Sequence, residues 1–164
     1  MTQPHTRHSL LAYLQELGIK AETFDHPPIF TVADGEEHWR GIPGTHCKNL
    51  FLKDAKGQMW LVSTPIARKV DLKTLPDRIG SARISFGSAD RLRATLFIEP
   101  GSVTPFALAN DRERKVVCVL DRAMMADPLL AFHPLENTAT TVLPPDGLLA
   151  FLKATGHAPK LVSL

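Results

Sequence analysis

Three short segments of the chain combine polar side chains with glycine or proline, as small catalytic pockets do. In the first, Gly44–Lys53, the residues Lys48 and Asn49 stand where a loop enters a predicted strand. A lysine in that place offers a compact charge and three donors, which suit a carbonyl, a ribose hydroxyl or a phosphate. On residue chemistry alone, a solvated lysine at the end of a strand is the simpler interpretation.

Two further segments have the same character. Glu99–Leu108, with the sequence EPGSVTPFAL, holds small residues between two prolines and could present backbone N–H groups to an ester carbonyl or an oxyanion. A tight turn between a helix and a strand is the alternative. In Phe132–Thr141, His133 is restricted by Phe132 and Pro134. It could orient a hydroxyl or a water molecule, or be a buried histidine with a backbone partner.

Common catalytic motifs are absent from the sequence. We find no Walker A loop, G-x-G-x-x-G, C-x-x-C, H-E-x-x-H or G-x-S-x-G pattern. We therefore expect no metal and no cofactor, and any hydrolysis should use water as the nucleophile. Cys47 adjoins Lys48 but should point away from it along a strand, and Cys118 lies in an apolar run, so both are interpreted as structural.

The elements that must position these segments follow from periodicity and turn residues. Apolar spacing and caps predict helices over Leu10–Leu17, Thr31–Trp39, Asp71–Ile79, Ser88–Leu96 and Pro144–Thr155. Alternation and β-branched residues predict strands over Ile19–Phe24, Lys48–Asp54, Gln58–Ser63, Val116–Asp121, Phe132–Pro134 and Thr138–Val142.

The clearest single feature is the hairpin of Lys48–Asp54 and Gln58–Ser63. Its three-residue connection ends in Gly57, where a left-handed residue is needed. Along the first of these strands, Leu50 and Leu52 should share one face, and Asn49 and Phe51 the other.

Length and composition set the frame for these elements. A chain of 164 residues is about one domain, and we expect 1–164 to form a single α+β domain with a mixed, mostly antiparallel sheet and helices packed on it. The 13 prolines indicate loops of fixed shape. Two cysteines and no apolar stretch long enough for a membrane span favour a cytoplasmic protein.

The charge balance is mild. Nineteen basic and 17 acidic residues give a net charge of +2, which argues against a protein that holds nucleic acid by charge alone. Basic residues do form local clusters, and one of these could contact RNA phosphates. They are Arg68, Lys69, Arg78, Arg83, Arg91, Arg93, Arg112, Arg114 and Lys115.

Taken in order, the three segments resemble the prolyl-tRNA synthetase-associated, or YbaK-like, editing domain family, over nearly the whole chain. The lysine of the family's strand matches Lys48, which Asn49 follows, and its glycine-x-x-x-proline loop matches Gly101–Pro105. The stretch from His133 to Thr141 looks like the version that removes alanine. The nearest resemblance is to free-standing members, which hydrolyse mischarged tRNA(Pro) in trans.

The resemblance implies an aminoacyl-tRNA deacylase acting on alanyl-tRNA(Pro), with contacts to the tRNA 3′ end and acceptor stem. It assigns catalytic roles to Lys48, Gly101 and His133, and substrate binding to Asn49, Ser102, Val103, Thr104 and Pro105. It also allows transient contact with prolyl-tRNA synthetase, and a monomer or weak homodimer.

Two alternatives remain open at this point. One is a deacylase of the same fold with another specificity, such as cysteinyl-tRNA(Pro). The other is a non-catalytic module that binds tRNA or DNA. The sequence does not fix the amino acid removed, the tRNA bases recognised, the oligomeric state or the general base.

Overall fold

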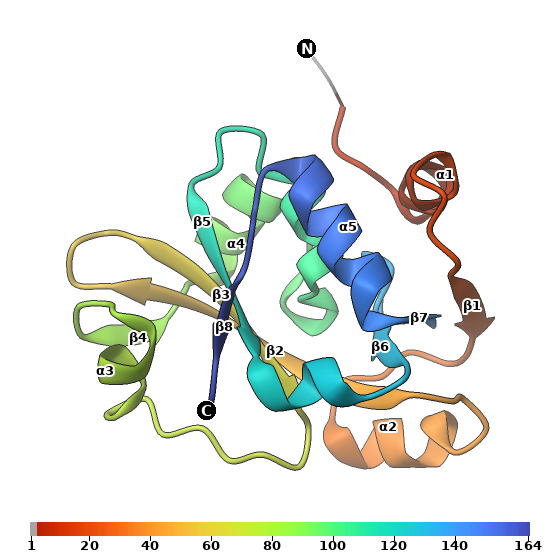
Figure 1. Cartoon of the computed structure of the whole chain (residues 1–164), viewed down its shortest axis with the longest axis horizontal. Helices are drawn as coiled ribbons and strands as arrows, with labels where there is room; N and C mark the ends of the chain where they lie inside the picture. Colours follow the sequence, from red (N-terminus) through yellow and green to blue (C-terminus); the bar gives the residue numbers. More distant parts are fainter. Residues whose placement is uncertain (1–2) are drawn as a thin grey trace.

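The computed structural model of the protein describes residues 3–164 as alternating short helices and strands (Figure 1). The helices are α1 (Arg7–Glu16), α2 (Val32–Trp39), α3 (Leu75–Ile79), α4 (Ala89–Leu96) and α5 (Pro145–Thr155), with 3-10 segments η1 (Pro100–Ser102), η2 (Pro105–Asn110) and η3 (Arg122–Ala126). The strands are β1 (Glu22–Asp25), β2 (Thr45–Asp54), β3 (Met59–Pro65), β4 (Ile84–Phe86), β5 (Val116–Asp121), β6 (Leu130–Phe132), β7 (Ala139–Leu143) and β8 (Lys160–Val162).

The strands form one mixed sheet in the order β1-β7-β6-β2-β3-β5-β8, with β4 paired to β2 outside this path. Pairs β1/β7, β6/β7, β2/β3 and β2/β4 are antiparallel, whereas β2/β6, β3/β5 and β5/β8 are parallel. In Figure 1, α5 crosses one face of the sheet and α2 lies beside the start of β2. The predicted α+β class with a mixed sheet is confirmed.

Strand alternation gives the sheet two separate apolar cores. Phe51 packs with Leu61 and Leu120 in the larger core, which also receives α1, α4, η2 and α5. Leu52 packs with Val62 in the smaller one, with α3. Leu50 and Leu52 therefore share a face opposite Phe51, as predicted. Full burial of each such leucine or phenylalanine contributes about 1.5–3 kcal/mol.

The predicted hairpin forms the centre of the sheet. Gly57 has a φ of 85°, the left-handed conformation that the connection requires. The register pairs Asn49 with Ser63 and Lys48 with Thr64. At the start of β2, Thr45 and His46 pair with β6, and the residues from Cys47 onward pair with β3, so the strand is a rigid mount for Lys48.

Several predicted boundaries were wrong. The first helix begins at Arg7 rather than Leu10, and the first hairpin strand begins at Thr45 rather than Lys48, so Lys48 lies inside the strand and not where the loop enters it. The strand expected over Ile19–Phe24 begins only at Glu22, because Gly18 is left-handed and the Ile19 N–H still bonds back to the helix at Leu14. The helix expected from Asp71 begins at Leu75, since the preceding residues form a turn.

The strand expected over Phe132–Pro134 is instead Leu130–Phe132. Its pairing with β7 ends at Phe132, and no partner continues the ladder through Pro134. His133 therefore leaves the sheet at the end of β6.

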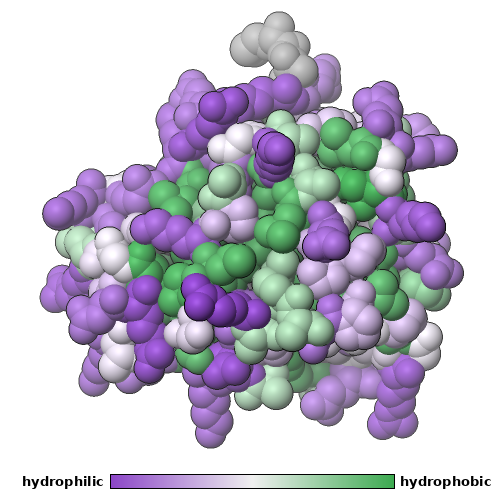
Figure 2. Space-filling view, in the orientation of Figure 1, coloured by the Kyte–Doolittle hydropathy of each residue, from purple (hydrophilic) through white to green (hydrophobic). Residues whose placement is uncertain are grey.

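No helix within residues 3–164 has the length and apolar character needed to cross a membrane. On the face shown in Figure 2, hydrophobic residues gather in the middle, over α5, and hydrophilic residues surround them.

Candidate active site

A small cavity of about 240 Å³ lies between α2, the start of β2 and the loop around η1. Four of the residues predicted to do chemistry line it together: Lys48, Asn49, Gly101 and His133. They come from three distant parts of the sequence. The remaining wall is mostly apolar and includes Ile29, Phe30, Val32, Trp39, Cys47, Ile66 and Val103. A few polar groups in an apolar pocket are typical of a site for a small reacting group.

Lys48 is the cation of this cavity. Its side chain is half-buried at the start of β2, and its amine makes no hydrogen bond or ion pair within residues 3–164. A lysine that the fold positions but does not pair retains three donors for a ligand. The geometry therefore leaves Lys48 free to contact an anionic or carbonyl oxygen.

Asn49 connects the strand to the loop. Its side-chain amide donates to the Val103 carbonyl at 3.1 Å, and its side-chain oxygen accepts from the Ser63 hydroxyl at 2.6 Å. Ser63 is buried and lies directly across the hairpin. Asn49 thus holds the loop against β2, a role that the sequence did not reveal. Its predicted contact with substrate stays a prediction.

In the loop, Gly101 presents a free donor. The Ser102 N–H donates to the Glu99 carbonyl at 2.9 Å, which closes the single turn of η1. The Gly101 N–H, by contrast, has no acceptor within the described part of the chain. A Cβ on Gly101 would lie 3.5 Å from Asn137 Nδ2 and 3.9 Å from the Phe30 ring. The loop therefore places at least one residue with an unpaired N–H in the wall of the cavity.

Only part of the remaining loop lines this cavity. Val103 lines it, but Ser102 lines a neighbouring cleft, and neither Thr104 nor Pro105 lies on its wall. The Thr104 hydroxyl accepts from the Phe106 N–H at 3.3 Å and caps η2, of which Pro105 is the first residue. Burial of η2 in the larger core draws both residues inward.

His133 has a defined tautomer. Its Nδ1 lies 2.9 Å from the Ala139 carbonyl, which can only accept, so Nδ1 carries the hydrogen. Burial lowers the pKa of His133 below 6.5, the hydrogen bond to Ala139 opposes this, and nearby His26 lowers the pKa further. Near pH 7 the ring is therefore neutral, and its Nε2 remains as an acceptor.

Three more histidines, which no sequence motif marked, lie in the region of His133. The ring of His26 lies 6.3 Å from that of His133 and 6.4 Å from that of His38. His46 stacks on Trp39 at 4.6 Å, and burial lowers its pKa. Within residues 3–164, no group of three or more histidine, cysteine or acidic side chains has the arrangement of a metal site.

Cys47 lies in the wall but does not have the properties of a nucleophile. Burial, with a smaller contribution from Asp127, raises the pKa of its thiol to about 12. The thiol also donates to the Thr45 carbonyl at 3.4 Å. A protonated, hydrogen-bonded thiol agrees with the structural role that the sequence suggested.

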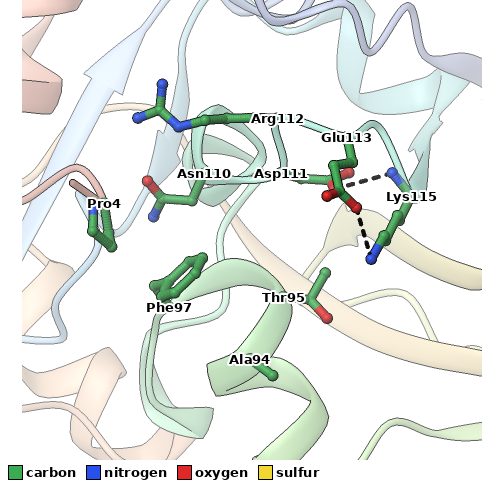
Figure 3. Close-up of a pocket in the computed structure, with 9 residues that line it drawn as sticks. All are labelled: Pro4, Ala94, Thr95, Phe97, Asn110, Asp111, Arg112, Glu113 and Lys115. Carbon is green, nitrogen blue, oxygen red and sulfur yellow. Dashed lines mark hydrogen bonds and ion pairs between the residues drawn. The ribbon is translucent and has the colours of Figure 1, made fainter. Parts of the chain in front are cut away.

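A larger cavity of about 380 Å³ near α4 and the end of η2 lacks comparable chemistry (Figure 3). Its polar groups are engaged within the protein. Lys115 pairs with Glu113 at 2.8 Å, its backbone N–H donates to Asp111 at 3.0 Å, and the Asn110 amide donates to the Leu96 carbonyl at 2.9 Å. None of the predicted catalytic residues lines it.

Comparison with known proteins identifies the family of the chain. Residues 26–151 match the model of the family described as the aminoacyl-tRNA editing domain. The prolyl-tRNA editing protein ProX of Acetoanaerobium sticklandii is 38% identical over 159 residues, which cover 96% of this chain and 97% of ProX. The prolyl-tRNA synthetase associated domain-containing protein 1 of Xenopus laevis is 38% identical over 161 residues, 95% of either chain.

A solved structure described as a candidate trans-editing enzyme for prolyl-tRNA synthetase has the same fold. It superimposes with a TM-score of 0.71 at 16% sequence identity, and the match covers 99% of both chains. The family match spans most of the chain and contains every residue that lines the cavity. The chain therefore belongs to the aminoacyl-tRNA editing domain family and is a hydrolase of the aminoacyl-tRNA deacylase type.

Proposed function

We propose that the chain hydrolyses alanyl-tRNA(Pro) in trans. The observation that carries the proposal is that one small cavity is lined by Lys48 with its unpaired amine, Gly101 with its unpaired N–H and His133 with Nε2 left as an acceptor. Editing of tRNA(Pro) is supported by the names of the relatives, and the choice of alanine is our own proposal.

In the reaction, a water oxygen attacks the ester carbonyl carbon, and the bond from that carbon to the ribose oxygen breaks. One water proton ends on the ribose oxygen, and the products are alanine and free tRNA. Negative charge develops on the carbonyl oxygen, where a preorganised donor lowers the barrier most. We assign this contact to the Gly101 N–H, with the Lys48 ammonium stabilising the charge or holding the adjoining ribose or phosphate.

His133 supplies an acceptor rather than a charge. A neutral imidazole with Nδ1–H fixed on Ala139 presents a lone pair at Nε2. This lone pair can accept from the alanyl ammonium or from a ribose hydroxyl, and so position the ester. The hydrogen bond from Asn49 to the Val103 carbonyl ties the glycine loop to the strand that carries Lys48.

The physical need for this activity explains why alanine is the expected substrate. A synthetase pocket built for proline cannot strongly reject a smaller amino acid, since a missing methylene changes binding by only about 1–3 kcal/mol. A second, smaller pocket can hydrolyse the wrong product and exclude proline by its bulk. Cysteine, which is close to alanine in size, is the main competing substrate.

The tRNA body would lie beyond the cavity mouth. Ile66 of the cavity wall leads into a loop with Arg68 and Lys69. Arg68 is engaged with Asp121 at 2.7 Å, whereas Lys69 is exposed and has no ion pair within residues 3–164. We assign Lys69 to the acceptor-stem backbone. Transient contact with prolyl-tRNA synthetase, a cytoplasmic location and a monomer or weak homodimer belong to the same proposal.

A deacylation panel tests it, with alanyl-, cysteinyl-, seryl- and prolyl-tRNA(Pro) as substrates. We expect alanyl-tRNA to be hydrolysed fastest and prolyl-tRNA to be spared. Lys48→Ala should abolish turnover, whereas Lys53→Ala, in the same strand but outside the cavity, should not. A preference for cysteinyl-tRNA would overturn the choice of alanine, and tRNA binding without turnover of any substrate would favour a non-catalytic module.

A further inference from the structure

Trp39 is the largest side chain in the wall of the cavity, and it belongs to no recognised sequence motif. It is the last residue of α2, and its ring stacks on His46 with 4.6 Å between ring centroids and 17° between planes. His46 is two residues before Lys48, on the same face of β2. The indole thus covers the strand next to the proposed catalytic lysine.

A glycine one turn earlier in α2, Gly35, leaves the space that the Trp39 ring occupies. Residues four apart lie on one face of a helix, and side chains lean toward its N-terminus, so the Trp39 ring lies over Gly35. A Cβ on Gly35 would fall 2.4 Å from Cη2, 2.5 Å from Cζ3 and 2.6 Å from Cζ2 of that ring. Gly35 is buried inside the helix, where glycine is unfavourable, and only a residue without Cβ leaves room for the indole.

The indole N–H does not explain the arrangement. Trp39 Nε1 is buried and has no hydrogen-bond partner within residues 3–164. An N–H without a partner contributes nothing to holding the ring in place. The value of Trp39 at this place is therefore its size and flat shape against His46.

We infer that Trp39, whose ring packs directly over Gly35, sets the size of the aminoacyl pocket and so determines which amino acid is removed. This inference rests on the proposed deacylase function and names a specificity-determining residue for it. The polar groups of Lys48, Gly101 and His133 would act on the ester, and the indole would limit the space beside them. A smaller side chain at position 39 admits larger aminoacyl groups.

The test measures kcat/KM for alanyl-, cysteinyl- and prolyl-tRNA(Pro) with the full chain and two variants. Trp39→Leu should raise the ratio of cysteinyl or prolyl to alanyl turnover by about tenfold or more, the range that one or two methylenes provide in a pocket. In Gly35→Ala the added Cβ displaces the Trp39 ring without changing the ring itself. This variant should therefore shift the same ratio of cysteinyl or prolyl to alanyl turnover.

Gly41→Ala is the matched control, because it lies two residues after α2 and a Cβ there would meet nothing within 4 Å. Its ratios should equal those of the wild type. Equal losses on every substrate in both variants would overturn the inference and make Trp39 a structural residue only. If the wild type hydrolyses none of the substrates, the proposed function fails. If the wild type is active but both variants keep its ratios, only the role of Trp39 fails.

Discussion

The side-chain amide of Asn49 donates to the Val103 carbonyl across 3.1 Å and so joins the lysine strand to the glycine loop. The other end of the same amide accepts from Ser63 at 2.6 Å, which fixes its orientation. Two of the proposed catalytic groups, Lys48 and the Gly101 N–H, therefore keep their separation through one side chain.

Loss of this connection should slow the reaction. Asn49→Ala leaves the Val103 carbonyl without its partner, at a cost of about 1–3 kcal/mol, and frees the loop to move from Lys48. Since small displacements of a catalytic group can lower rates by about a hundredfold, we expect kcat to fall at least about tenfold. Single-turnover deacylation measures this.

Ser63→Ala is the paired comparison for Asn49. It removes the bond that orients the amide but keeps the bond to Val103, so its effect should be smaller. An unchanged rate in Asn49→Ala, or a larger loss in Ser63→Ala, would contradict a positioning role for Asn49.

The protonation of His133 should appear in the pH profile. Burial lowers its pKa below 6.5, so near pH 7 the ring is neutral and Nε2 can accept. Acidification through this lowered pKa converts Nε2 into a donor, and kcat/KM should then fall. His133→Gln should lack that acidic limb. His26 and His46 face the same region, and a limb that persists in His133→Gln would assign the titration to one of them.

Several parts of the site were predictable because they depend on local patterns. Lys48 in the first strand of the hairpin and His133 between an aromatic residue and a proline are visible within a few positions, although the strand begins at Thr45 and Lys48 lies inside it rather than at its entrance. The bond from Asn49 to Val103 was not, because it spans 54 positions and depends on the register of the sheet. The fate of Thr104 and Pro105 was hidden for the same reason, since the larger core decides which way η2 turns.

In the fold, too, local patterns were predictable and contacts between distant residues were not. The central hairpin and β5 were predicted because alternation and the Gly57 turn are strong local signals. β4 and β8 have three residues each, too few to show a period, and they exist because β2 and β5 offer them partners. The spacing of Gly35 and Trp39 was in the sequence, but only the folded ring explains it.

The Cys47 thiol should be unreactive although it lines the cavity. Its pKa of about 12 leaves almost no thiolate near neutral pH, and the thiolate is the form that alkylating reagents attack. Incubation with iodoacetamide at about pH 7.5 should leave the deacylation rate unchanged, and mass spectrometry should find Cys47 unmodified. Cys118 is buried with a similar pKa and serves as the internal reference. Rapid inactivation with modification of Cys47 would show that the thiol is ionised and accessible.

Asp54 should control the acid stability of the hairpin. Burial alone would raise the pKa of its carboxyl, but hydrogen bonds from the Trp60 indole and from the backbone of Gln58, Lys56 and Ala82 outweigh this and lower the pKa below 3.8. A carboxylate with a lowered folded-state pKa stabilises the protein above its unfolded-state pKa, and this contribution disappears as the pH falls through the folded-state value.

Asp54→Asn cannot titrate and weakens the bonds that the charge strengthens. We therefore expect the free energy of unfolding to drop by about 2 kcal/mol or more at pH 7. The difference from the wild type should shrink as the pH falls below about 3.8, because the carboxyl of the unfolded chain then takes up a proton that the folded carboxylate, with its lowered pKa, resists. Urea unfolding at a series of pH values measures both. Asp146→Asn, at an exposed position in α5, should cost less than about 1 kcal/mol. A difference between wild type and Asp54→Asn that stays constant down to pH 2 would mean that folding does not lower the pKa of this carboxyl, and would contradict the prediction.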